Sequence, residues 1–272
     1  MTNRPSPAPA AHPVAVALAV LLLLAAGAAL GAGFALEEQV RRLMRDPGTD
    51  TTIFTRIGQT SLTAEHVESI AAPLATGAAV ALVIALVLPR LRAASVVRLD
   101  LRILAALPAL GTVLIALGGV AAAEYARRQT VIGTLTDPGA EAALVPSAEL
   151  SSALVTAGGV AVMVWLCLLA TAGRAGRARR LAPWAAVAAL LAAGIVLLQL
   201  RIGGYVRMQG LYAGFYAATP DPRVAGREIV ALQSRDLLYS IVGTSLFAAA
   251  SVGVALAVAA RAFRSRLSVS LR

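Results

Sequence analysis

Six long apolar runs constrain this sequence more than any other feature. They cover residues 14–36, 70–89, 103–123, 151–172, 182–200 and 238–260, and none of them has Asp, Glu, Lys, Arg or His in its central part. An α-helix rises about 1.5 Å per residue, so about 20 apolar residues cross a hydrocarbon core about 30 Å thick. The runs therefore predict six membrane-spanning helices.

The rest of the chain is too short and too apolar for a second domain. Of its 272 residues, 58% are hydrophobic and 14% are charged, whereas a soluble domain carries about 25% charged residues. The longest connector, 201–237, is too short to bury a core of its own. We therefore expect an all-α, polytopic integral membrane protein, preceded by a disordered Pro/Ala-rich tail over residues 1–13.

A cleaved signal peptide is the alternative interpretation of the first run. Gly33 and Ala35 form a small-x-small pair of the kind that signal peptidases cleave, but the run is long for the apolar region of a signal peptide. The lone cysteine, Cys167, lies inside an apolar run, so an intrachain disulfide is excluded.

Arginine placement predicts the orientation. Every basic residue is Arg, and the short connectors and two tails on one side hold 13 arginines against one acid, Asp100; the longer connectors hold 11 arginines and 13 acids. Positive charge in short loops marks the cytoplasmic side. We expect both termini in the cytoplasm of a bacterium and the chain in its inner membrane. The net charge of +10 then reflects topology, not nucleic-acid binding.

The chain repeats one pattern three times. Thr63-Ala-Glu65, Ser147-Ala-Glu149 and Ser234-Arg-Asp236 each join a hydroxyl residue to an acid, and 27 positions further on stand Arg90, Arg174 and Arg261. Ser or Thr caps helix starts and an acid suits the first turn. An Asp-Pro pair precedes each motif, at Asp46-Pro47, Asp137-Pro138 and Asp221-Pro222. The pattern predicts three antiparallel hairpins, over 14–92, 103–180 and 181–264, and a basic tail over 265–272. The three hairpins are either a true internal repeat or unrelated segments that use the same residue types to start and end their helices.

Catalytic motifs are absent from the sequence. It has no Gly-rich phosphate loop, nucleophile elbow or His-Glu metal motif, and His12 and His66 stand alone. Proton pumps usually carry an ionisable residue at depth, and no apolar run has one at its centre. We expect no enzymatic activity, no catalytic residue, no metal and no cofactor.

Small residues inside the runs have two interpretations. Gly27 and Gly31 form a GxxxG pair, and further glycines stand among alanines, where they let helices approach closely. One interpretation is assembly into an oligomer or pore, and the other is packing of the six helices within one chain. The glycines in question are Gly111, Gly118, Gly119, Gly158, Gly159 and Gly243.

Hydroxyl and aromatic residues give the candidate sites. Threonines inside the runs either return a hydrogen bond to their own helix backbone or line an ion path; the candidates for that path are Thr76, Thr112, Thr156 and Thr244. A helical stripe in the last long connector is either an aromatic belt at the lipid boundary or a docking surface for a partner. It consists of Tyr205, Met208, Tyr212, Phe215 and Tyr216.

The second hairpin resembles the MotA/TolQ/ExbB family. LPALGTVLIALGG, Leu107 to Gly119, matches the GTV-type run of that family's first helix, and SSALVTAGGVAV, Ser151 to Val162, matches the EAL-x-TTA-x-G-type run of the second. Fainter echoes occur at 68–82 and 235–249. The resemblance implies a subunit that packs beside its own copies around a partner's single helix and couples the proton-motive force to work, with Thr112 and Thr156 facing the ion path.

The chain departs from that family at three points. Ser152 stands where the family has Glu before the Ala-Leu pair, the large cytoplasmic region is missing, and the threefold hairpin plan differs. The leading hypothesis is a non-catalytic subunit of an energised transport or ion-channel complex whose partner supplies the proton-carrying carboxylate. A scaffold subunit without conductance is the alternative, and a small-solute permease is the third. The expected partners are the lipid bilayer and other membrane subunits or copies of the same chain.

Overall fold

The computed structural model is a bundle of six long helices. It describes residues 13–45, 53–91, 98–99, 101–133, 145–171, 176–216, 222–263 and 270–271. Each helix contains a stretch long and apolar enough to cross a membrane, which confirms an all-helical chain with six candidate spans. The helices are α1 (Pro13–Arg45), α2 (Ile53–Leu91), α3 (Leu101–Gly133), α5 (Val145–Thr171), α6 (Arg177–Tyr216) and α7 (Pro222–Phe263).

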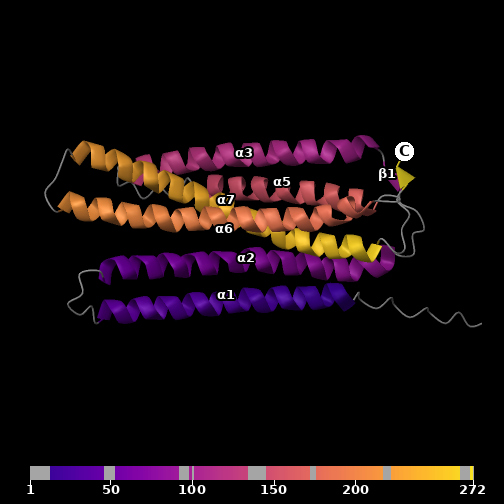
Figure 1. Ribbon diagram of the computed structural model, residues 1–272, viewed down its shortest axis with the longest axis horizontal. Helices are drawn as coiled ribbons and strands as arrows, with labels where there is room; N and C mark the ends of the chain where they lie inside the picture. The colour runs from indigo at the N-terminus through magenta and orange to yellow at the C-terminus, as the bar shows by residue number, and fades with distance from the viewer. Residues whose placement is uncertain are drawn as a thin grey trace, which may run out of the picture.

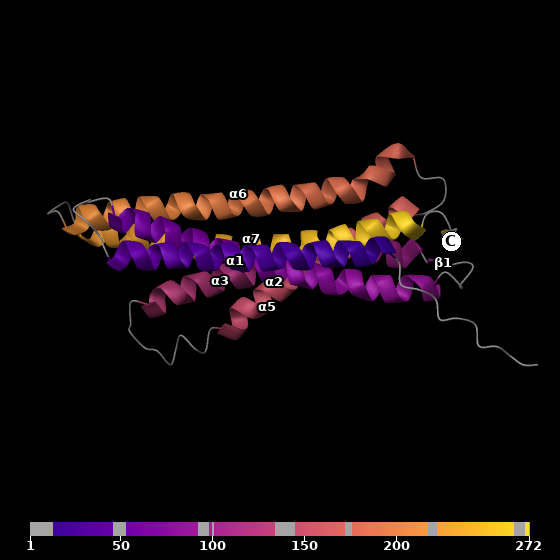
Figure 2. The same cartoon turned by 90° about the horizontal axis from the view of Figure 1, so that it is seen from below.

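Helix α7 is the centre of the bundle. Helix α1 packs along α2, α3 along α5 and α6 along α7, while α7 also contacts α5 and α2 (Figure 1). Half of the most apolar segment of α7 is buried, against 17% in α1 and in α3. Turned by 90°, the bundle shows one end of the α3/α5 pair leaning away from the other helices (Figure 2). Helices α1 and α3 thus expose most of their apolar surface.

Both ends of the described chain lie at the same end of the bundle (Figure 1). There, two short strands, β1 (Arg98–Leu99) and β2 (Ser270–Leu271), pair in parallel. They join the segment between α2 and α3 to the C-terminal tail, a contact that the sequence did not predict.

Glycines set the closest helix crossings. A Cβ on Gly158 would lie 2.6 Å from the carbonyl oxygen of Gly111, and a Cβ on Gly111 would lie 2.8 Å from that of Gly158. A Cβ on Gly77 would lie 2.9 Å from the backbone of Ser251, whose hydroxyl donates a 2.6 Å hydrogen bond to the carbonyl of Pro73. Small residues that let backbones touch are the usual glue between helices in lipid. Intrachain packing therefore explains these glycines.

Three helices are much longer than their apolar runs. Helices α2, α6 and α7 have 39, 40 and 42 residues, hence lengths of about 60 Å, about twice a hydrocarbon core. Most of the predicted connector 201–237 is therefore helical. The helical stripe expected in this connector thus belongs to a longer helix, α6, because polar helices can continue past the apolar run when they pack on one another.

Apolar contacts and ion pairs support the polar extension. Val40 on α1 and Ile53 and Ile57 on α2 form a buried cluster with Leu43 packed against it. Along α1, Arg41 pairs with Glu37 and Arg42 with Glu38, both four residues apart. Pairs at this spacing add about 0.2–0.5 kcal/mol each to a helix.

The predicted helix caps need correction. Thr63 and Ser234 lie well inside helices that begin at Ile53 and Pro222. The Thr63 hydroxyl donates to the carbonyl of Gln59 at 2.7 Å, a bond within one helix, so neither motif caps a helix start. Proline suits the first turn of α7, since it has no N–H to leave unpaired. The side chain of Ser147, the pairs Asp46-Pro47 and Asp137-Pro138, and Asp221 lie outside the described residues.

Candidate functional site

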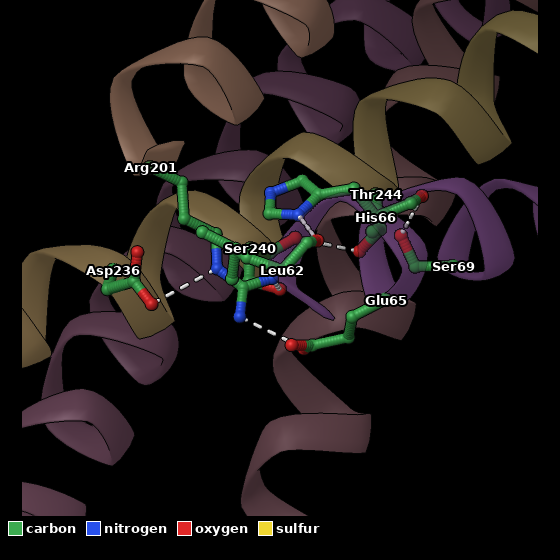
Figure 3. A network of polar contacts seen from close by, with 8 residues as sticks. All are labelled: Leu62, Glu65, His66, Ser69, Arg201, Asp236, Ser240 and Thr244. Carbon is green, nitrogen blue, oxygen red and sulfur yellow. Dashed lines mark hydrogen bonds and ion pairs between the residues drawn. The ribbon is translucent and has the colours of Figure 1, made fainter. Parts of the chain in front are cut away.

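Arg201 is a buried charge that joins three helices. Its side chain is 8% exposed. Its Nε donates to Asp236 Oδ2 at 3.1 Å, its Nη1 donates to Ser240 Oγ at 3.1 Å, and its Nη2 donates to Glu65 Oε1 at 2.9 Å (Figure 3). We call Arg201, Asp236, Ser240 and Glu65 the Arg201 network.

Helix geometry brings this network together. Arg201 follows directly on the apolar run 182–200 of α6, and Asp236 lies just before the run 238–260 of α7. Ser240 lies one helical turn beyond Asp236, so both face the same side of α7. Glu65 approaches from α2. The network therefore lies where three apolar runs end.

The charges of the network do not balance. One guanidinium faces two carboxylates, which leaves one formal negative charge in excess. The two acids differ in their surroundings, since the Asp236 side chain is 21% exposed and that of Glu65 is 61% exposed. Water screens the Glu65 pair and makes it weak. The Arg201–Asp236 pair is sheltered, and Asp236 is the acid on which Arg201 chiefly depends.

Two buried polar atoms in and beside the network have no partner. Asp236 Oδ1 and His66 Nε2 are both shielded from solvent, and neither makes a hydrogen bond to any residue that the structure describes. His66 is 4% exposed, and its Nδ1 contacts the carbonyl oxygen of Leu62, which can only accept. The Nδ1 therefore carries the hydrogen, and in the neutral ring Nε2 is an unused acceptor. Such atoms are rare in folded proteins and call for an explanation.

Two clefts flank the network. The arginine cleft, about 340 Å³ between α6 and α7, includes Arg201 and Asp236 in its wall. The acidic cleft, about 440 Å³ between α1 and α2, includes Glu65. Arg201, in the wall of the arginine cleft, is thus hydrogen-bonded to Glu65, in the wall of the acidic cleft. The acidic cleft is lined by Glu37, Val40, Arg41, Met44, Ser61, Glu65 and Glu68.

The four candidate ion-path threonines do not form one line. Thr76 and Thr112 are exposed and donate to their own helices, at the carbonyls of Ala72 and Pro108. Thr156, in contrast, is half-buried and reaches the carbonyl of Ser245 on α7 at 3.5 Å.

Thr244 is also half-buried on α7, where it donates to Ser240 O at 2.9 Å. The structure therefore places Thr156 and Thr244 inside the bundle and leaves Thr76 and Thr112 on its outer faces.

The aromatic stripe is only partly described. Tyr205 is half-buried, and its hydroxyl lies against Gly58 on α2, where a Cβ would collide with it. Met208 is half-buried as well. The side chains of Tyr212, Phe215 and Tyr216 lie outside the described residues. At its described start, the stripe packs between α6 and α2.

The GxxxG pair on α1 faces away from the bundle. A Cβ on Gly27 or Gly31 would meet nothing within 4 Å, and the same holds for Gly119 on α3. The packing of the described residues therefore does not explain these three glycines.

Sequence reasoning missed the Arg201 network. It placed Arg201 and Asp236 in a water-exposed connector, and it treated Glu65 and Asp236 as markers of helix starts. The repeat pattern was the only feature of the sequence that pointed to the network. It aligned Glu65 on α2 with Asp236 on α7 as the acid of the same motif. Among the described residues, no group of three His, Cys, Asp or Glu side chains is placed to hold a metal ion. The chain matches no protein-family model, no curated protein and no solved structure at a significant level.

Proposed function

We propose that the chain is a non-catalytic, multi-pass subunit of an energised transport or ion-channel complex of the bacterial inner membrane, similar in plan to the MotA/TolQ/ExbB family. The proposal includes three antiparallel hairpins with both termini in the cytoplasm. The excess of arginine in the short connectors supports this orientation. In it, the Arg201 network lies at the outer boundary of the hydrocarbon.

The Arg201 network is the observation that carries the proposal. Burying a charge costs several kcal/mol unless it is well paired, and ionisable residues among membrane helices commonly serve ion or proton transfer. A purely structural latch would satisfy every buried atom. Here Asp236 Oδ1 and His66 Nε2 remain without partners, and the network carries one excess negative charge. Both features favour uptake of a proton.

The network offers a route and a response for that proton. The arginine cleft has Asp236 in its wall, so water in that cleft can bring a proton to the acid directly. The guanidinium of Arg201 keeps its own protons and only holds Asp236 in place. A proton on Asp236 neutralises the acid that holds α7 against Arg201 of α6. The contact between the two helices weakens, and a small electrostatic change becomes a movement between helices. In this account the chain supplies a carboxylate itself, whereas the sequence assigned that task to a partner.

Proton flux through the purified complex tests the proposal. The chain is isolated in mild detergent with whatever accompanies it, reconstituted into vesicles, and assayed with a pH-sensitive dye after a membrane potential is imposed. We expect Asp236→Asn to slow the flux at least about a hundredfold, the low end for loss of a positioned proton-transfer group. The control is Glu228→Gln, which removes an exposed acid paired with Arg207. Equal flux in wild type and Asp236→Asn would overturn the assignment.

The family resemblance has its own test. It assigns the ion path to Thr112 and Thr156, of which Thr112 lies on an outer face open to a partner's helix. We expect Thr112→Val together with Thr156→Val to abolish proton flux while the complex still assembles. Unchanged flux would exclude these threonines from the path.

The outward GxxxG pair favours a second function, that of a scaffold subunit. A Cβ on Gly27 or Gly31 would meet nothing within 4 Å among the described residues, and such pairs commonly seat another helix in lipid. A scaffold predicts that Gly27→Leu with Gly31→Leu removes co-purifying subunits without destabilising the chain, and that vesicles show no conductance. Co-purification of the same subunits with the double variant would rule this face out.

A further inference from the structure

We infer that the arginine cleft between α6 and α7 binds a phosphate ester that carries a neighbouring hydroxyl or ammonium group, as the head group of a phospholipid does. This inference concerns binding and does not depend on proton transport. The cleft has a volume of about 340 Å³. It is lined by Gln199, Leu200, Arg201, Gly203, Gly204, Arg207, Leu232, Arg235, Asp236 and Tyr239.

Three arginines give the cleft its charge. Arg201 stands in the wall with its guanidinium anchored by the network, and Arg207 is paired with the exposed Glu228. Arg235 is exposed and has no hydrogen-bond or ion-pair partner among the described residues. Because Arg201 and Arg207 are already paired with carboxylates, Arg235 is the cation that remains for an anionic ligand. Guanidinium groups match the oxygen geometry of phosphate with paired N–H donors.

Glycine opens the space. A Cβ on Gly203 or on Gly204 would meet nothing within 4 Å, although glycine costs about 1 kcal/mol relative to alanine inside a helix. Because these two glycines have no side chains, there is room beside Arg201. Close packing of helices does not explain why glycine stands at these two positions. A bound group in the cleft would.

Asp236 specifies the second half of the ligand. Its Oδ2 is taken by Arg201, but its buried Oδ1 accepts no hydrogen bond. A ligand with a hydroxyl or ammonium beside its phosphate would place that donor against the Asp236 side chain, which is 21% exposed in the wall of the cleft, while its phosphate faces the arginines. A quaternary ammonium cannot donate in this way. Phosphatidylglycerol should therefore bind, and phosphatidylcholine should not.

The position of the cleft favours a lipid over a free phosphate. Leu200 is half-exposed and lies at the end of the apolar run of α6, next to Arg201. Apolar surface therefore meets cationic surface at the cleft, as a lipid boundary requires. A free phosphate ester would use the arginines but gain nothing from this leucine.

Binding measured on the full chain tests the inference. The purified protein in detergent is mixed with phosphatidylglycerol, phosphatidylcholine or sn-glycerol 3-phosphate, and retained ligand is counted by native mass spectrometry. We expect phosphatidylglycerol to bind at least about tenfold more tightly than phosphatidylcholine, a difference of about 1.4 kcal/mol. Displacement of the lipid by sn-glycerol 3-phosphate would identify a soluble phosphate ester as the natural ligand of the same cleft.

Two variants assign the binding to this cleft. Arg235→Gln removes an exposed cation that has no hydrogen-bond or ion-pair partner in the described part of the chain, and Gly204→Leu fills the open space. Each should lower the affinity for phosphatidylglycerol at least about tenfold. Arg41→Gln is the matched control, because it removes one charge from the acidic cleft on α1. Equal binding of the two lipids by the wild type, or undiminished binding by both cleft variants, would overturn the inference.

Discussion

Arg201 shows how a single side chain can hold a membrane bundle together. Its guanidinium, on a side chain that is 8% exposed, donates hydrogen bonds to Glu65 on α2 and to Asp236 on α7. A lysine could not replace it, because only a planar group with several N–H donors reaches a carboxylate, a hydroxyl and a second carboxylate at once. The cost of burying this charge is offset only while Asp236 remains opposite it.

The Arg201→Met variant measures that dependence. It leaves Asp236 sheltered and without its cation, so the free energy of unfolding should fall by about 3 kcal/mol or more. Thermal unfolding in detergent is the measurement. Arg207→Gln removes an exposed arginine, 67% exposed and paired with Glu228, and should cost less than about 1 kcal/mol. Similar losses in both variants would show that burial of Arg201 does not matter.

The helices differ in what holds them. Helix α5 is fixed to α3 by the mutual approach of Gly111 and Gly158, whose backbones touch. Helix α1 packs along α2 but turns Gly27 and Gly31 outward. Glycine thus brings two helices of this chain together in one place and faces outward in another. The sequence alone does not show which of the two roles a given glycine has.

A pair of matched substitutions exposes this difference. The added methyl in Gly158→Ala would lie 2.6 Å from a carbonyl oxygen, so the α3/α5 contact must open, at a cost of about 1–3 kcal/mol. The methyl in Gly27→Ala meets open space and should leave stability unchanged or slightly higher, since alanine favours helix. Urea or thermal unfolding of both variants distinguishes them. A tolerated Gly158→Ala would mean that the helices do not cross there.

The elements also show what a sequence can and cannot reveal. The six spans were predictable because lipid imposes a length and a composition on each helix separately. The full lengths of the extended helices were not predictable, since they depend on contacts between helices. Val40 on α1, for example, shares a buried cluster with Ile57 on α2. The Arg201 network was hidden for the same reason. Its members lie on three helices, and each looks like an ordinary boundary residue by itself.

The whole molecule has an unequal distribution of charge, since the short connectors and tails hold 13 arginines against one acid and the longer connectors hold 11 arginines against 13 acids. In the proposed orientation the arginine-rich connectors face the cytoplasm, and the extended parts of α1, α2, α6 and α7 project outward above the Arg201 network. This orientation decides from which side protons and ligands reach the two clefts.

Cysteine labelling of intact cells checks the orientation. In a background with the buried Cys167 replaced by alanine, a cysteine at Arg207 should react with a membrane-impermeant maleimide added outside. A cysteine at Arg179, in the arginine-rich first turn of α6, should react only after the membrane is opened. The reverse pattern would invert the topology and place both clefts in the cytoplasm.

The central claim is that the network takes up a proton, and nuclear magnetic resonance of histidine tests it most directly. The chain has two histidines, so His12→Ala leaves the ring of His66 as the only signal, beside the network. Between about pH 5 and pH 8, the range in which histidine itself commonly changes charge, we expect its resonances to move. Asp236→Asn should alter that movement, and Glu228→Gln should not. Resonances that stay constant with pH, or that move identically in Asp236→Asn, would contradict the account.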